Sequence, residues 1–172
     1  MTQSQQTGSE ELDFYDRPAI IAHFESIQPS LLQELRETHP NVEVDFTPQD
    51  LSRLTGQLQK LQNDLLGKTS VRTELHCPKI PARFFQPTQP LQPDSALHHI
   101  LKGAFQFRFA NNWSDWGFDR AEKRETLLGL ILYIRDVLVR SELLHTPRIY
   151  LGEAIELQLK EELSSLVTLM KG

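Results

Sequence analysis

The stretch DRAEKRETLLGLILYIRDVLVR, from Asp119 to Arg140, carries the clearest helix pattern of the chain. Asp119 and Glu122 have the spacing of a capping box, which predicts that the helix starts at Asp119. Its apolar residues cover more than half of a helix circumference: Leu127, Leu128, Leu130, Ile131, Leu132, Ile134, Val137, Leu138 and Val139. A helix with so wide an apolar surface has to be covered on several sides, so we expect it at the centre of the domain.

A second helix is predicted between Thr47 and Gly67. Thr47 is a good N-cap, Pro48 suits the first helical position, and Asp50 favours the positive end of a helix. Five leucines follow at the alternating three- and four-residue spacing of a coiled-coil seam: Leu51, Leu54, Leu58, Leu61 and Leu65. Two heptads are too few for a free coiled coil. We therefore expect this edge to pack within its own domain, with a homodimer seam as the alternative.

Several short segments alternate apolar and polar residues, the pattern of a half-buried strand. They are residues 42–46, 71–75, a short edge strand around 82–86, and 105–109, where Phe105, Phe107 and Phe109 share one face. Ile149 and Leu151 are compatible with a further strand, and 155–159 fits either a strand or the start of a final helix, which we favour. Further helices are expected near 16–27, 30–40 and 94–103, the last capped by Asp94 and ended by Gly103. The predicted fold class is α+β: a helix-dominated single domain with a small, mainly antiparallel sheet.

The polar residues 1–12 are predicted to form a disordered tail, and residues 13–172 one globular domain. Residues 78–93 contain five prolines, which predicts an extended segment over the surface. Pro87, Pro90 and Pro93 recur at the period of polyproline II, so a proline-rich ligand for another domain is the alternative.

Composition limits the function only loosely. The single cysteine excludes an internal disulfide, and the longest apolar run, residues 127–134, is too short to span a membrane. With no signal-like N-terminus, a cytoplasmic protein is predicted. The net charge of −5 conceals a basic middle: residues 67–108 carry six basic and two acidic side chains, and residues 1–66 carry four basic and eleven acidic ones. These two regions are expected to meet within the molecule, with an anion-binding face as the alternative.

No catalytic, cofactor-binding or metal-binding motif is present in the sequence. The only local clusters, His76-Cys77 and His98-His99, lack metal-ligand spacing. We therefore predict no catalytic residues, no cofactor and no metal. An enzyme with a scattered site, and a single-stranded nucleic-acid-binding module using the basic 67–108 region, are kept as alternatives.

The segment NNWSDWGF combines turn-forming residues with both tryptophans of the chain. Loops lie on the surface, and exposed tryptophan is common at the centres of protein interfaces. Asp115, between the tryptophans, is expected to cap a turn. We predict a non-enzymatic protein-binding module, such as an adaptor, assembly factor or regulator. A homodimer is kept as an alternative, and nucleic acid is not expected as the partner. Its predicted partner-binding residues are Arg108, Trp113, Asp115, Trp116 and Phe118.

Overall fold

The computed structural model describes residues 13–66, 79–87, 91–145 and 157–169. Its elements are α2 (Pro18–Phe24), α3 (Gln28–Thr38), α4 (Pro48–Leu66), η1 (Ala82–Phe85), α5 (Ala96–Ala110), η2 (Ala121–Lys123), α6 (Arg124–Arg140) and α7 (Leu157–Leu169). The prediction of a helix-dominated fold is confirmed. The predicted sheet, and with it the α+β class, is wrong, because the described residues include no strand.

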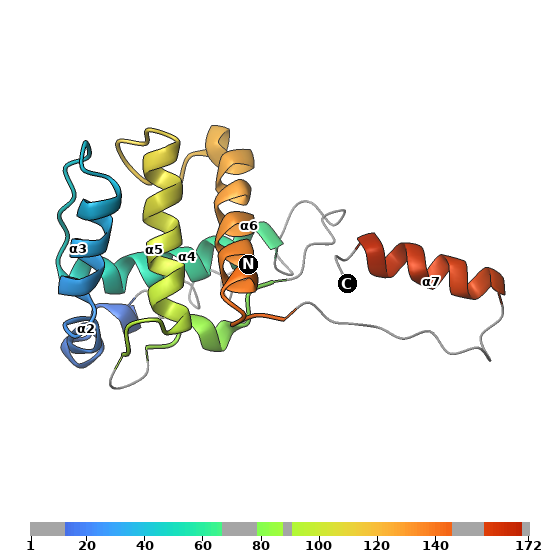
Figure 1. The fold of residues 1–172 in the computed structure, drawn as a ribbon, viewed down its shortest axis with the longest axis horizontal. Helices are drawn as coiled ribbons and strands as arrows, with labels where there is room; N and C mark the ends of the chain where they lie inside the picture. The colour runs from blue at the N-terminus through green and yellow to red at the C-terminus, as the bar shows by residue number, and fades with distance from the viewer. Residues whose placement is uncertain (1–12, 67–78, 88–90, 146–156, 170–172) are drawn as a thin grey trace.

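The helices form a bundle in which α5 lies between α3 and α6, and α4 crosses them (Figure 1). The closest packing is between α5 and α6, and α2 lies against α4. In the same view α7 lies apart from the bundle, and none of its residues is buried. No helix among the described residues combines the length and apolarity that a bilayer span requires.

Helix α6 is central, as predicted. Leu127, Leu130, Ile131, Ile134 and Leu138 are almost completely buried. The predicted start at Asp119 is wrong, since α6 begins at Arg124 after the 3-10 turn η2 and has no side-chain cap. The backbone between Gly117 and Lys123 instead makes two successive tight turns, through Arg120 N to Gly117 O and Lys123 N to Arg120 O.

Helix α4 confirms its predicted cap. The Thr47 hydroxyl accepts a hydrogen bond from the Asp50 N–H (3.2 Å), and the Asp50 carboxylate accepts one from the Thr47 N–H (2.8 Å). All five leucines of the edge are buried within the chain, so this edge is not available as a dimer seam. Tyr15 packs against the α4 backbone at Gly56, where a Cβ would lie 2.6 Å from the Tyr15 ring.

The predicted strand over 105–109 is the C-terminal half of α5. Ser95, rather than Asp94, caps this helix, and Gly103 lies inside it instead of ending it. Gly103 faces α6, where a Cβ would make an ordinary van der Waals contact with Val137 at 3.5 Å. Helical geometry distributes the three phenylalanines over two sides: Phe105 stacks on Phe46, and Phe107 contacts Tyr133.

Val42 lies in a bend and residues 43–46 form no regular element, so this strand prediction is also wrong. Side chains of α3 replace a neighbouring strand: Arg36 Nε donates to Val44 O (3.1 Å) and Gln28 Nε2 donates to Phe46 O (2.9 Å). Val44 and Phe46 still reach the core, as their spacing predicts, whereas Val42, the third apolar residue of the alternation, is exposed.

The predicted edge strand near 82–86 is wrong, since η1 occupies it. The proline-rich segment is held by Gln62, whose side-chain amide both donates to Ile80 O and accepts from Ile80 N–H, each at 2.9 Å. The predictions for the tail at 1–12, the strand at 71–75, and Ile149 and Leu151 lie outside the described residues. The favoured final helix is confirmed from Leu157 onward.

Candidate protein-interaction surface

The loop that joins α5 to η2, residues 111–120, is here called the aromatic loop (Figure 1). Its backbone turns at Asn112 and Gly117, both with positive φ (54° and 60°). The positive φ at Gly117 favours glycine, whereas a Cβ there would displace only the flexible end of the Lys123 side chain, 2.9 Å away. The loop is folded tightly onto the C-terminal end of α5.

Arg108, on the last turn of α5, holds this loop in place. Its Nε donates to Trp113 O (3.2 Å), its Nη2 donates to Ser114 O (2.6 Å), and its guanidinium lies over the Trp116 ring (4.9 Å). Burial lowers the pKa of Arg108, while the nearby Asp115 carboxylate acts in the opposite direction. The Arg108 guanidinium therefore fixes the loop at three residues, Trp113, Ser114 and Trp116.

Asp115 links the middle of the aromatic loop to its C-terminal end and to η2. Its carboxylate accepts from Arg120 Nη2 (2.6 Å) and Lys123 Nζ (3.4 Å), and Lys123 also lies over the Trp113 ring (4.9 Å). The two ends of the aromatic loop are thus joined by ion pairs and cation–π contacts. The carboxylate of Asp115 binds these two side chains, whereas the expected turn cap would bind a backbone N–H.

The aromatic side chains are neither fully exposed nor enclosed. Trp113 contacts Phe107 edge-on at 5.4 Å, Trp116 contacts Phe105 edge-on at 5.4 Å, and Trp116 stacks on Phe118 at 5.7 Å. Trp113, Trp116 and Phe118 are all half-buried and rest on the core. The structure thus brings the five predicted residues together, while their partner-binding role stays a prediction.

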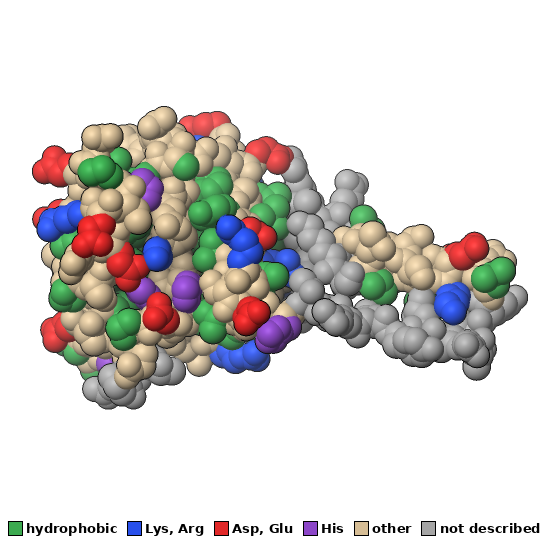
Figure 2. Space-filling model, viewed as in Figure 1, with side chains coloured by type: hydrophobic (Ala, Val, Ile, Leu, Met, Phe, Trp, Pro, Cys, Tyr) green, Lys and Arg blue, Asp and Glu red, His purple; other side chains and the backbone are tan. Residues whose placement is uncertain are grey.

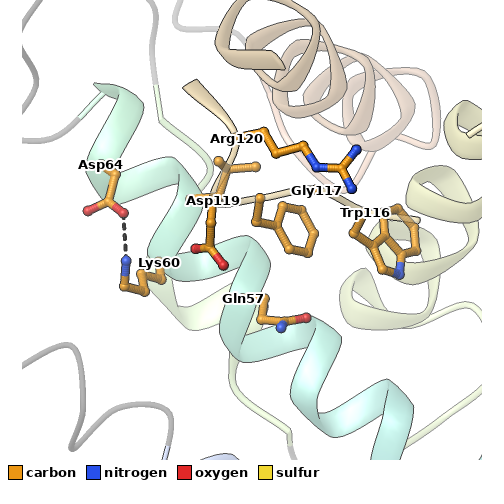
Figure 3. Close-up of a pocket in the computed structure, with 9 residues that line it drawn as sticks. Gln57, Lys60, Asp64, Trp116, Gly117, Asp119 and Arg120 are labelled. Atoms are coloured by element: carbon orange, nitrogen blue, oxygen red, sulfur yellow. Dashed lines mark hydrogen bonds and ion pairs between the residues drawn. The ribbon is translucent and has the colours of Figure 1, made fainter. Parts of the chain in front are cut away.

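A groove separates the aromatic loop from α4 (Figure 3). It has a volume of about 620 Å³, and a hollow of about 340 Å³ adjoins it toward the start of α6. Trp116, Gly117, Phe118, Asp119 and Arg120 line one wall of the groove. Sequence reasoning missed the opposite wall, formed by Gln57, Lys60, Leu61 and Asp64. Gln57, Lys60 and Asp64 recur at helical spacing beside the leucine edge of α4. The sequence thus places them on one side of the helix but does not indicate that the loop lies opposite.

The other candidate residues are dispersed. Of the basic residues in 67–108, Lys102 pairs with Glu34 (2.7 Å) and Arg108 is committed to the loop, whereas Lys68 and Arg72 lie outside the described residues. Figure 2 shows acidic and basic side chains interspersed over the visible face of the bundle. The nucleic-acid alternative therefore stays a prediction. Within the described part of the chain no three histidine, cysteine or carboxylate side chains are grouped as metal ligands, and His76 and Cys77 lie outside it.

Fold and surface together define a helical domain with an aromatic loop fixed beside a groove. The chain belongs to the family described as the SWIRM-associated domain at the N-terminal, whose model matches residues 4–144. The match contains α2 to α6, the aromatic loop and the groove, and it ends before α7. Membership suggests a chromatin-associated regulatory or protein-interaction module.

Proposed function

We propose that this protein is a non-enzymatic interaction module of a nuclear, chromatin-associated complex, and that it contacts a protein partner through Arg108, Trp113, Asp115, Trp116 and Phe118. These five residues are called the aromatic surface. The observation that carries the proposal is the fixed aromatic loop beside a groove, within the part of the chain that matches the family. A nuclear location replaces the cytoplasmic one predicted from composition.

Order in the aromatic loop supports this proposal. Binding costs conformational entropy whenever a loop has to be ordered by its partner. Here Arg108 and Asp115 already hold the loop through hydrogen bonds to two carbonyls and two cations. A partner that binds it would therefore meet a preorganised surface.

Side-chain chemistry supports it as well. Tryptophan and arginine are enriched among the few residues that carry most of the energy of an interface. Trp113, Trp116 and Phe118 remain half-buried, so each can lose further area to a partner without unfolding the core. Homodimerisation, the other partner considered, remains a prediction that a measurement of mass in solution would test.

The test is capture from nuclear extract with the full chain as bait, followed by mass spectrometry. Trp116→Ala and Phe118→Ala are compared with the wild type and with Phe84→Ala. Phe84 is a matched control, because it is also half-buried and stacked by an arginine, Arg83 at 5.1 Å. It lies in η1, near the N-terminal end of α5, whereas the aromatic loop follows the C-terminal end (Figure 1).

We expect the two loop variants to fold, to keep cooperative thermal unfolding, and to lose a partner that the wild type and Phe84→Ala both retain. Retention of every wild-type partner by both loop variants would contradict the proposal.

A further inference from the structure

The groove between α4 and the aromatic loop is lined by charged residues of both signs, and most of them are already paired. Lys60 Nζ binds Asp64 at 2.9 Å across one turn of α4. Arg120 Nη2 binds Asp115 at 2.6 Å, and Asp115 lies in the loop outside the groove lining. Neither cation is therefore free to attract a second carboxylate without giving up the first.

Asp119 is the exception among the groove residues. It is exposed and makes no hydrogen bond or ion pair with any residue that the structure describes. In Figure 3 Asp119 and Gln57 extend into the space between α4 and the loop, whereas Arg120 extends toward Trp116. Of the four charged residues that line the groove, Asp119 is therefore the one without a described partner.

An aromatic side chain, Phe118, lines the groove next to this carboxylate. Aromatic rings attract cations through the negative potential of their faces, most strongly when the site is partly shielded from water. The neighbouring rings show the same preference within the chain, since Arg108 lies over Trp116 and Lys123 lies over Trp113, both at 4.9 Å.

We propose that the groove receives a basic side chain, lysine or arginine, from a peptide segment of the partner, with Asp119 binding its charge and Phe118 packing on it. This inference rests on the proposed function and names the chemistry of the partner. Its basis is charge complementarity between the unpaired Asp119 carboxylate and a cation. Arg124 does not line this groove; it lines the adjoining hollow, where Asp119 and Asp64 are also present.

The test uses three twelve-residue peptides that differ only at their centre: Leu-Arg-Leu, Leu-Gln-Leu or Leu-Glu-Leu within the same glycine-serine flanks. Each is titrated into the ¹⁵N-labelled full chain and followed by NMR. The two tryptophans give two indole N–H signals, both from the aromatic loop, so binding at this site has its own readout.

We expect the arginine peptide to shift the Trp116 indole signal and the backbone signals of residues 117–120, with affinity falling from arginine to glutamine to glutamate. Asp119→Asn should weaken the arginine peptide by about two- to fivefold, the range for an exposed ion pair. It should leave the glutamine peptide unchanged. Asp45→Asn, at an exposed carboxylate on the loop before α4, is the matched control and should bind as the wild type does.

Equal or tighter binding of the glutamate peptide would overturn the inference, as would wild-type affinity of Asp119→Asn for the arginine peptide. If none of the three peptides binds while partner capture still depends on Trp116, the basic-residue inference fails and the proposed function stands. If capture is also independent of Trp116 and Phe118, both fail.

Discussion

Replacing Arg108 by methionine removes the guanidinium that holds the aromatic loop and keeps most of the apolar stem. The variant loses a charged hydrogen bond to Trp113 O and a second one to Ser114 O. Ser114 is exposed, so water can replace the second bond, and we count mainly the first. A hydrogen bond with a charged donor contributes about 1.5–3 kcal/mol, and a partly exposed cation–π contact adds about 0.5–1 kcal/mol.

The expected loss for Arg108→Met is therefore about 2–4 kcal/mol. For a domain of this size that corresponds to a fall in Tm of about 4–16 °C. Because both tryptophans lie in the aromatic loop, intrinsic fluorescence reports on this region directly, and their emission should shift to longer wavelength as the loop opens. Arg108→Lys keeps the charge but lacks the planar fork, so it should fall between the wild type and Arg108→Met.

Arg53→Met serves as the control, because Arg53, on α4, binds the exposed carboxylate of Asp16 at 2.7 Å and makes no described contact with the loop. It should leave tryptophan emission unchanged. Wild-type Tm together with wild-type emission in Arg108→Met would refute the reasoning that this side chain orders the loop.

Three further predictions concern the bundle. Gly56→Ala places a Cβ 2.6 Å from the Tyr15 ring, so strain should outweigh the gain in helix propensity and lower the free energy of urea unfolding by about 1 kcal/mol. Gly129→Ala is the control, because its Cβ meets its nearest neighbour at 3.5 Å; it should raise that free energy by up to about 1 kcal/mol, and equal effects of the two variants would contradict this account. Gln62→Leu leaves a buried N–H and C=O of the following connector unpaired and should cost about 2–4 kcal/mol; a near-neutral change would show that the connector is not held there. Burial lowers the pKa of His98, so the unfolded chain binds a proton more readily than the folded one. The stability gained by keeping His98 neutral is complete above its unfolded pKa near 6.5 and should be lost as pH falls below that value. The urea midpoints at pH 7.5 and 5.5 should therefore differ less in His98→Gln than in the wild type, and an unchanged difference would contradict the assignment.

Local patterns predicted the helices correctly where the capping residues or the apolar spacing were unambiguous. The Thr47 cap and the leucine spacing of α4 led to a correct helix with a correct buried edge, because capping and helical periodicity agree there. The apolar width of α6 likewise predicted its central position.

The predicted sheet failed because alternation over five residues is compatible with other structures. Phe105, Phe107 and Phe109 alternate, yet the helix that begins after Ser95 continues through them and packs along α6. At Val44 and Phe46 the carbonyls that would have needed a neighbouring strand are bound by Arg36 and Gln28 side chains. Contacts of this kind join residues that no local window compares.

The candidate site likewise has one part that the local sequence predicts and one part that only the folded chain shows. Its composition was visible in the sequence as two tryptophans among turn-forming residues, but the groove requires α4 to lie opposite the loop. Nothing local to Gln57 or Lys60 indicates that neighbour. The paired state of Arg120 and the unpaired state of Asp119 also follow only from the folded arrangement.

Photo-crosslinking in nuclear extract tests the central claim, that the aromatic loop and its groove are the contact surface, most directly. A benzophenone-bearing amino acid is placed at Ala121, which is exposed in η2 beside the groove, or at Ala82, which is exposed in η1. The account predicts a light-dependent adduct with the captured partner from position 121 and none from position 82. An adduct from position 82 alone would contradict it.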